Sequence, residues 1–334
     1  MTSNATRIGI LGAGGVAEAI HLPTLTQMPG LEVAWLCDQV PARAVKLARE
    51  WGIRGAFGDL RACPDVDVML VAIPVGLRRE ALARAFERGW HVFVEKPFAT
   101  SVEEHLGIVQ EAARAGVQVG VGLMRRFFRS TALARLAVSR QAFGPVVEVW
   151  AAEAARMSTT GREGAWYQAD RAAAGGGVLM ETGSHLVDQV FQALGAEAFD
   201  GLRAVFTHSR GIDLEARAVA NVKRAGAAAT VPVHLVVSRI RDLYPGVVIR
   251  CERASIRIGA DAAVPAQVLG LDDRPLCHLE GAEGGTNFYQ PFMLEWQAFL
   301  AQCRSGVSSV VDGASALLGT RFIAAAYANG AGAA

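Results

Sequence analysis

Apolar and polar positions alternate with two different periods along the first third of the chain. Short, almost wholly apolar runs are typical of strands buried on both faces, and here they alternate with segments of helical period. The expected strands are 7–11, 31–37, 67–73, 91–94 and 117–121. The expected helices are one that begins at Val16 and the segments 42–51, 77–88 and 101–115. This alternation predicts an α/β domain with a doubly wound parallel sheet, the Rossmann architecture.

The pattern changes after Leu123. Strand-like runs now follow one another between about Arg203 and Ile258 without a helix of useful length, which indicates an antiparallel sheet. The other expected elements are a strand over 146–155 and helices over 131–143, 178–194, 288–303 and 314–327. We therefore predict a first domain over 1–123 and a second, α+β domain with an open, mainly antiparallel sheet over 124–334. The last helix is a candidate for packing back on the first domain, and the Gly/Ala tail after Asn329 is expected to fray.

The composition of the chain limits the kinds of molecule that it is expected to bind. The 334 residues contain 33 Lys+Arg and 32 Asp+Glu, a net charge of +1, which argues against nucleic acid or an acidic membrane as the main partner. No apolar stretch reaches the roughly 20 residues of a membrane span, and the first residues lack a signal-peptide pattern. Five cysteines, without a CxxC pair, are expected to be reduced thiols in the cytoplasm, and we expect no metal site.

A glycine turn follows the first expected strand. The segment Gly12-Ala13-Gly14-Gly15-Val16-Ala17 fits GxGxxA and opens a helix. The first glycine allows a tight turn, the second lets a pyrophosphate approach the backbone, and the small last residue permits helix–strand packing. We therefore assign Gly12, Gly14, Gly15 and Val16 to dinucleotide binding; a purely structural turn is the alternative.

Asp38 ends the second expected strand. A carboxylate there accepts hydrogen bonds from the adenosine ribose hydroxyls and repels the additional phosphate of NADP. Two unit charges about 4 Å apart interact by roughly 4 kcal/mol at an effective dielectric of 20, and a quarter of that gives about a fivefold preference. The sequence therefore favours NAD, with capping of the following helix as the alternative task of Asp38.

Glu95-Lys96-Pro97 lies at the carboxyl end of the fourth expected strand, and Ile73-Pro74 lies at the end of the third. Ligands of parallel sheets bind at this edge, so we expect Ile73, Pro74, Glu95 and Lys96 to contact the cofactor. The Lys96 charge can stabilise a developing alkoxide. A solvated surface lysine is the alternative.

A second glycine-rich segment, 175–188, carries Glu181, Gly183, His185 and Asp188. On a helix Glu181 and His185 share one face. Neutral His185 can take a proton from a substrate hydroxyl, while Glu181 orients the imidazole or pairs with Lys96. Gly183 inside a helix indicates that something packs closely against the backbone. An ordinary His–Glu pair is the alternative.

These motifs, in this order, resemble the Gfo/Idh/MocA oxidoreductases, which include glucose–fructose oxidoreductase and inositol dehydrogenase. The resemblance covers nearly the whole chain, to Val311-Asp312-Gly313. It implies an N-terminal Rossmann domain, a C-terminal domain with a large open sheet, and a catalytic set of Lys96, Glu181 and His185.

The chain departs from the family pattern at a few positions. Glu181 replaces the usual aspartate, Val75 and Arg78 stand where Asn and His are usual, and Met124 precedes the retained Arg125-Arg126-Phe127. The first departure touches the chemistry. We expect the others to alter the edges of the cofactor and substrate sites.

The leading hypothesis is an NAD-dependent dehydrogenase acting on a secondary alcohol of a sugar, cyclitol or sugar derivative. Trp166 and Tyr167 are candidates for stacking on a sugar, and Arg126 and Arg156 for binding an anionic substituent. The alternatives are an NAD-using glycosidase without net redox and a catalytically silent NAD-binding regulator. Because the open sheet needs a cover, we expect a homodimer or homotetramer joined through it.

Overall fold

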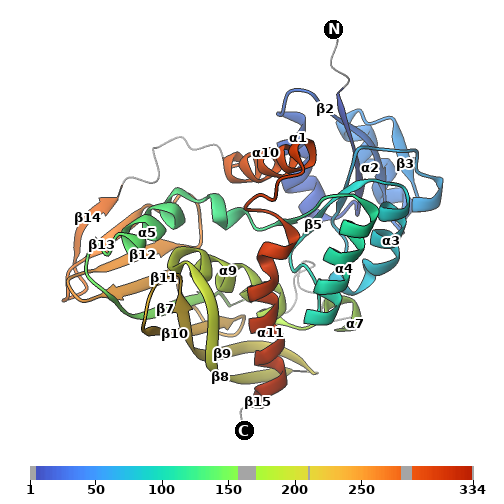
Figure 1. Ribbon diagram of the computed structural model, residues 1–334. Coiled ribbons are helices and arrows are strands. Elements are labelled where there is room, and N and C mark those ends of the chain that lie inside the picture. The colour runs from blue at the N-terminus through green and yellow to red at the C-terminus, as the bar shows by residue number, and fades with distance from the viewer. Residues whose placement is uncertain (1–4, 157–170, 210, 280–287, 333–334) are drawn as a thin grey trace. The chain divides into compact units, whose positions relative to one another are not determined.

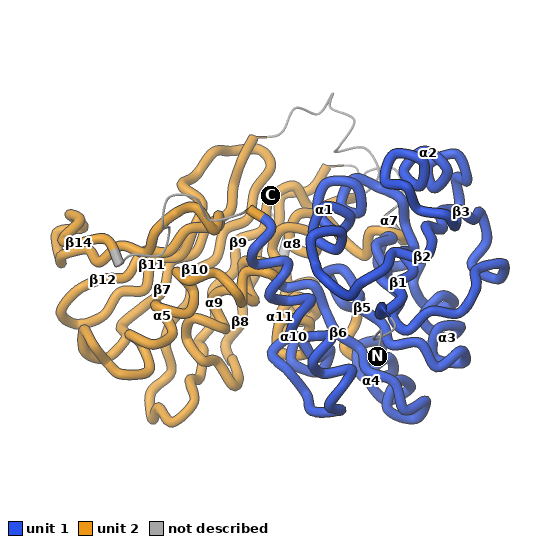
Figure 2. The backbone as a smooth tube through the Cα atoms, turned by 90° about the horizontal axis from the view of Figure 1, so that it is seen from above, with its two compact units in different colours: residues 1–99, 103–123, 289–316 blue, residues 100–102, 124–288, 317–334 orange. Residues whose placement is uncertain are grey.

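The computed structural model describes residues 5–156, 171–209, 211–279 and 288–332. The chain divides into two compact units, which Figure 2 shows in different colours. Unit 1 comprises 1–99, 103–123 and 289–316, and unit 2 comprises 100–102, 124–288 and 317–334. The main crossing from unit 1 to unit 2 lies between Leu123 and Met124, where the hydrophobic pattern changes.

Unit 1 is built on a six-stranded sheet in which every neighbouring pair is parallel (Figure 1). In sheet order the strands are β3 (Gly55–Phe57), β2 (Leu31–Cys37), β1 (Thr6–Leu11), β4 (Val68–Val71), β5 (His91–Glu95) and β6 (Val119–Gly122). The order reverses between β1 and β4, which creates a crevice at the carboxyl ends of these strands. The α/β fold predicted for this part of the chain is confirmed.

Helical segments cover both faces of this sheet. They are η1 (Ala17–His21), α1 (Leu22–Thr26), α2 (Pro41–Trp51), η2 (Leu60–Ala62), η3 (Val75–Leu77), α3 (Arg79–Glu87), α4 (Val102–Ala115), α10 (Gln290–Ser305) and η6 (Gly313–Ala316). On one face, α3 and α4 bury residues such as Leu82 and Ile108 against Met69 and Val92 of the sheet. The buried stretches of β1, β4, β5 and β6 are almost wholly apolar, because neither face of the sheet meets water there.

The helix that returns to unit 1 is α10, which the sequence analysis placed within the second domain. Its side chains Trp296 and Phe299 pack on Phe93 of β5, with ring centroids 4.6 and 5.2 Å away. A Cβ at Gly120 of β6 would lie 2.5 Å from the Phe299 ring, so the glycine makes room for the helix. The last helix, α11 (Leu317–Asn329), instead buries Phe322 in the core of unit 2.

Unit 2 contains a nine-stranded sheet. In sheet order its strands are β14 (Pro275–Leu279), β13 (Ala266–Leu269), β12 (Ser255–Gly259), β11 (Leu243–Cys251), β7 (Val146–Ala154), β10 (Thr230–Ser238), β9 (Ile212–Arg224), β8 (Ala196–Ser209) and β15 (Ala331–Gly332). Neighbours are antiparallel except β7 with β10 and β15 with β8. The mainly antiparallel sheet is therefore confirmed. Within the tail that was expected to fray, Ala331–Gly332 form β15 beside β8.

The helices that the structure describes in unit 2 pack on one face of this sheet (Figure 1). The remaining helical segments of unit 2 are η4 (Met124–Phe127), α5 (Arg129–Ser139), α7 (Arg171–Ala174), α8 (Val178–Glu181) and α9 (Gly183–Leu194). Along β9, from Ala216 to Arg224, buried and exposed residues alternate strictly, so one face joins the core under α5, α9 and α11. The other face presents side chains such as Trp150 and Val219 to solvent.

Candidate active site

The turn after β1 requires glycine at Gly12. Its φ is +104°, in the region that disfavours L side chains, and a Cβ there would lie 2.4 Å from the carbonyl oxygen of Ala72. The Gly12 amide donates to the Cys37 carbonyl at 2.8 Å and ties the turn to the end of β2. Gly12 is therefore fixed by the fold itself.

Gly14 and Gly15 differ from Gly12. A Cβ at either position would meet no atom of the chain within 4 Å. Val16 then leads into η1, and Ala17 is fully buried. The turn thus opens a helical segment with bare backbone at its start, an arrangement that suits a phosphate group.

Asp38 holds the same turn in place. Its Oδ2 accepts from the Ala13 amide at 2.9 Å, and its Oδ1 accepts from the Val40 amide at 2.8 Å. The side chain does not cap α2, because the N-cap residue is Val40 and no side-chain cap bond is present. Each carboxylate oxygen can accept more than one hydrogen bond, so Asp38 can fix the turn and still accept from a ribose.

Glu95, at the end of β5, lies in a buried chain of hydrogen bonds. Its Oε1 is 2.7 Å from Nε2 of His21, and Trp296 Nε1 donates to Nδ1 of the same imidazole at 3.2 Å. An indole nitrogen is only a donor, so Nδ1 of His21 is the acceptor and Nε2 carries the proton. His21 therefore donates to Glu95, and η1, β5 and α10 are joined through one imidazole.

The second oxygen of Glu95 accepts from the Lys96 amide at 3.1 Å. Burial by itself raises the pKa of Glu95, but the hydrogen bond from His21 and the charges of Lys96 and Arg78 outweigh it and leave the pKa below its usual value. Glu95 is thus an anion that fixes the backbone of Lys96. Lys96 itself is half-buried, and the Lys96–Pro97 peptide bond is cis.

The residues predicted to bind the cofactor end four neighbouring strands of one sheet. Gly12–Val16 follow β1, Asp38 follows β2, Ile73 and Pro74 follow β4, and Glu95 and Lys96 end β5. The described structure therefore gathers them along one edge. His21, Arg78 and Trp296 also contribute to this edge. Sequence reasoning expected Arg78 to alter the edge of a site but assigned no part to His21 or Trp296.

In unit 2, two residues from distant segments, Asp213 and Tyr327, leave no room for a side chain in the glycine triplet. A Cβ at Gly176 would lie 2.5 Å from the Tyr327 hydroxyl, and a Cβ at Gly177 would lie 2.3 Å from the Asp213 carbonyl oxygen. The Gly183 position would bring a Cβ to 2.8 Å from Leu179, which confirms the close packing expected there. These glycines allow β9 and α11 to approach the start of α8.

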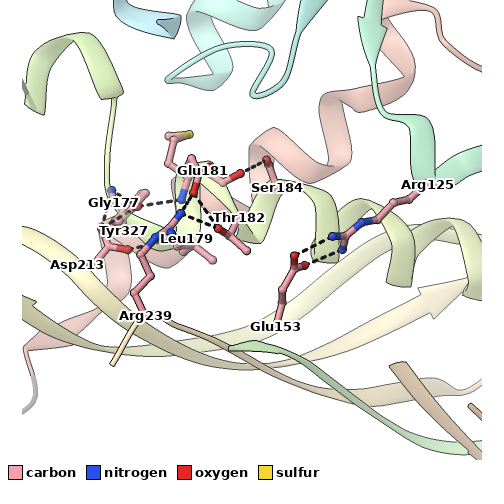
Figure 3. Close-up of polar contacts among 11 residues, drawn as sticks. Arg125, Glu153, Gly177, Leu179, Glu181, Thr182, Ser184, Asp213, Arg239 and Tyr327 are labelled. Carbon is pink, nitrogen blue, oxygen red and sulfur yellow. Dashed lines mark hydrogen bonds and ion pairs between the residues drawn. The ribbon is translucent and has the colours of Figure 1, made fainter. Parts of the chain in front are cut away.

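Asp213 and Tyr327 cap α8 (Figure 3). Asp213 accepts from the amides of Gly177 and Leu179 at 2.8 and 2.9 Å, and the Tyr327 hydroxyl donates to Asp213 at 3.0 Å. Burial raises the pKa of Tyr327, and the Asp213 charge adds to that effect. The start of the segment that carries Glu181 is thereby fixed by a carboxylate at a helix N-terminus.

The helix predicted over 178–194 is present as two segments, α8 and α9, which meet at Thr182, a residue whose own φ and ψ are helical. The Ser184 hydroxyl donates to the Glu181 carbonyl at 3.0 Å, while the His185 amide donates to the Thr182 carbonyl at 3.2 Å, which tightens the turn. Glu181, Thr182 and His185 remain partly exposed on an otherwise mostly buried segment. The junction thus presents polar groups at the start of α9.

Glu181 forms an ion pair with Arg239, which follows β10 (Figure 3). Its Oε2 also accepts from the Thr182 hydroxyl at 2.8 Å, and Arg239 donates to that hydroxyl at 3.1 Å. The longer side chain at position 181 is thus held by a cation from the sheet. Arg239 was missed by sequence reasoning, because a lone arginine after a strand carries no motif.

The paired arginines of η4 each bind a carboxylate in unit 2. Arg125 donates to both oxygens of Glu153 at 2.6 and 2.8 Å (Figure 3). Arg126 contacts Asp188 through Nε and Nη2 at 2.9 and 2.6 Å, and its side chain is 1% exposed. These bonds fix the Arg126 side chain inside unit 2. Its binding of an anionic substituent stays a prediction.

The remaining expectations concern the proposed sugar-stacking and anion-binding residues, a metal site and membrane spans. Trp166 and Tyr167 lie outside the described residues. Arg156 is exposed, and its amide donates to Asp242 at 2.7 Å. Among the described residues, no group of three or more His, Cys, Asp or Glu side chains is arranged to hold a metal ion, and no helix is long and apolar enough to cross a membrane.

Known proteins share this sequence pattern. Residues 6–123 match the family model described as "Oxidoreductase family, NAD-binding Rossmann fold", and residues 131–257 match the "GFO/IDH/MocA C-terminal domain". The D-glucoside 3-dehydrogenase of Escherichia coli is 29% identical over 212 residues, 63% of this chain and 59% of that protein. The scyllo-inositol 2-dehydrogenase (NAD(+)) of Bacillus subtilis is 31% identical over 124 residues, 36% of each chain. The matched segments thus span less than two thirds of these relatives.

The fold also has solved counterparts. A 3-ketoreductase from Actinomadura kijaniata, in complex with NADP and TDP-benzene, superposes with a TM-score of 0.83 at 20% identity and covers 98% of this chain and 99% of its own. At this identity the likeness concerns the fold alone.

Substitution of Gly12 should reduce stability, whereas substitution of Gly14 should reduce cofactor binding. Gly12→Ala should lower the free energy of unfolding by at least about 2 kcal/mol, because it adds a backbone clash to a strained φ. Gly14→Val should leave that free energy within about 1 kcal/mol, because its side chain enters open space, yet weaken binding of the dinucleotide at least tenfold. Urea denaturation and NADH fluorescence titration measure the two quantities. Equal effects of both variants on stability would contradict the distinction.

Proposed function

The chain belongs to the Gfo/Idh/MocA family of oxidoreductases, and from this premise we propose that it is an NAD-dependent dehydrogenase. Its substrate is a secondary alcohol, or the matching ketone, of a sugar, cyclitol or sugar derivative. The observation that carries the proposal is the position of Lys96. It follows a buried strand at the carboxyl edge of the sheet, and its amide is bonded to Glu95. The glycine turn and Asp38 follow β1 and β2 along the same edge.

The proposed reaction assigns one task to each side chain. His185 removes the hydroxyl proton of the substrate, and Lys96 stabilises the negative charge that develops on the oxygen. When bound, the dinucleotide supplies the acceptor for the hydride. Lys96 lies in unit 1 and His185 in unit 2, so the proposal requires both residues to act on one substrate.

Glu181 acts as an orienting group in this scheme. Its ion pair with Arg239 and its bond from Thr182 support a fixed carboxylate rather than one that exchanges protons. Trp166 keeps its proposed place as a platform for the apolar face of a sugar.

We also propose that the protein works in the cytoplasm. All five cysteines are free thiols, and Cys37, Cys63 and Cys251 are buried as small apolar side chains. Reduced thiols are typical of a reducing compartment.

The activity predicts a clear loss in two variants. Lys96→Ala and His185→Ala should each lower kcat at least about a hundredfold on the best substrate of a sugar and cyclitol panel with NAD, because each removes one contribution to the transition state. Lys223→Ala and His208→Ala, at exposed positions, are the matched controls. NADH absorbance measures the rates.

Other outcomes of this assay would contradict the proposal. Full activity in both variants would remove the assigned roles. Release of a free sugar without accumulation of NADH would indicate the glycosidase alternative. Binding of NAD without turnover on the whole panel would indicate a regulator.

The preference for NAD predicts a ratio of kcat/KM values, NAD over NADP, of at least about fivefold in the wild type. Asp38→Ser should lower this ratio, because it removes the charge that repels the additional phosphate of NADP. Asp59→Ser, which removes a carboxylate from the start of η2, should leave the ratio unchanged. Steady-state kinetics with both cofactors provide the test, and equal wild-type values for the two cofactors would contradict the preference.

The bare face of the unit 2 sheet is proposed to pair with a second copy of the chain. Trp150 is 47% exposed there and stacks on His234 at 4.0 Å, and Val219 lies opposite His234 in the neighbouring strand with 43% exposure. A contiguous exposed apolar row needs a cover, and a symmetric homodimer or homotetramer is the simplest one.

Charge on this face should separate the subunits. Trp150→Glu should shift the mass measured by light scattering at micromolar concentration from an oligomer toward the monomer, because it buries a carboxylate in the interface. Leu136→Glu places the same charge at an equally exposed apolar position on α5 and should leave the mass unchanged. A wild-type protein that is already monomeric would contradict the interface.

A further inference from the structure

Arg78 occupies an unusual place for a cation. It lies between η3 and α3, and only 3% of its surface is exposed. Its Nε donates to the Ile73 carbonyl at 2.8 Å, and its Nη1 donates to the carbonyls of Glu95 and Pro97. One guanidinium therefore joins the segments that follow β4 and β5.

Two of these three acceptors flank Lys96. The Glu95 carbonyl precedes Lys96 in the chain, and the Pro97 carbonyl follows it. The Lys96 amide is held separately, by the Glu95 side chain at 3.1 Å. The backbone on both sides of Lys96 is thus fixed by Arg78, and its own N–H is fixed by Glu95.

Burial makes this cation costly. Desolvation lowers the pKa of Arg78 to about 10, against the opposing charges of Glu95 and Glu104, so the group is still charged at neutral pH. A buried charge without compensation is strongly unfavourable, and an apolar side chain would fill the same space without that penalty. What an apolar residue lacks is the set of donors for three carbonyls.

We infer that Arg78 is a positioning residue for Lys96, acting through the carbonyls on either side of it. The inference rests on the proposed function for the task of Lys96 in the reaction. The planar guanidinium matters, since its donors point in fixed directions that the single ammonium of a lysine does not reproduce.

Other bonds of the loop do not involve Arg78. The Glu95 carboxylate contacts His21 and the Lys96 amide directly, and we expect these two bonds to remain when the guanidinium is removed. A variant at position 78 should therefore fold, with a loosened Lys96 segment. Arg78→Met removes the donors at similar volume, and Arg78→Lys keeps the charge without the fork.

A matched control stands next to it in the chain. Arg79 has an exposed side chain and pairs with Glu111 on the surface. Arg79→Met makes the same chemical change one position away without touching the three carbonyls.

The first test measures the chemical reactivity of the Lys96 amine and does not require turnover. The chain contains only three lysines, Lys46, Lys96 and Lys223, so reductive methylation followed by mass spectrometry reports each amine separately. In the whole protein, Arg78→Met should raise the labelling rate of Lys96 at least threefold while Lys46 and Lys223 keep theirs. Arg78→Lys should raise it as well, and Arg79→Met should change none of the three.

A second test asks whether Arg78 acts through Lys96 during the reaction. Arg78→Met should lower kcat at least tenfold and leave the Kd for NADH within twofold. It should have no further effect on kcat in a protein that already carries Lys96→Ala. A role confined to stability would lower the active fraction equally in both backgrounds.

The outcomes are distinct. A Lys96 labelling rate that is unchanged, lowered, or raised equally with the other two lysines overturns the inference, as does an additive effect in the Lys96→Ala protein. If Arg78→Met does not fold, Arg78→Lys decides by the same thresholds. Absence of turnover in the wild type would contradict the proposed function, while the labelling experiment would still decide the placement of Lys96.

Discussion

The main-chain groups at the carboxyl edge of the unit 1 sheet need hydrogen-bond partners, and this need constrains the residues around them. Strands end there, and each end leaves main-chain carbonyls and amides that have no partner in the ladder. This chain satisfies them with buried side chains, chiefly Glu95 and Arg78, whose opposite charges offset part of each other's desolvation. The same bonds fix the backbone of Lys96. The contacts that pair the main-chain groups at the strand ends therefore also position the Lys96 amine.

Unit 2 solves a related problem at the start of a helix. The amides at the beginning of α8 have no partner in the helix, and the Asp213 carboxylate accepts two of them. The junction at Thr182 then leaves Glu181 to bond with Arg239 and sets His185 in the first turn of α9. In each unit, a residue of proposed catalytic importance follows a backbone terminus that is held by a buried carboxylate.

The fold could be predicted from the sequence because the period of the apolar positions shows which face of each element is buried. The alternation over the first 123 residues, and the loss of helices between 203 and 258, were sufficient for both sheets. The segment of α10 was assigned correctly as a helix but not to unit 1, since the pattern of an amphipathic helix does not say which sheet it covers. The irregularity at Thr182 was missed because apolar residues keep the helical period on both sides of it.

From the sequence, candidate site residues could be predicted only where they belong to a motif of fixed spacing. The glycine turn, Asp38 and the segments of Lys96 and His185 are local in sequence, whereas their supports come from far away. His21 is 74 residues from Glu95, and Arg239 is 58 from Glu181. Arg78 stood out in the sequence as a departure from the family pattern, but its three carbonyl acceptors exist only after folding. Long-range pairs of this kind leave no trace in a single sequence.

The place of α10 in unit 1 has a consequence for biosynthesis. Trp296 and Phe299 cover Phe93, yet they leave the ribosome after nearly all of unit 2. Until then the nascent nucleotide-binding half exposes an aromatic surface, and His21 lacks its indole donor. The two halves are therefore not independent modules: a piece cut after Leu123 is a truncated domain, and the nucleotide-binding half reaches its final form only near the end of translation.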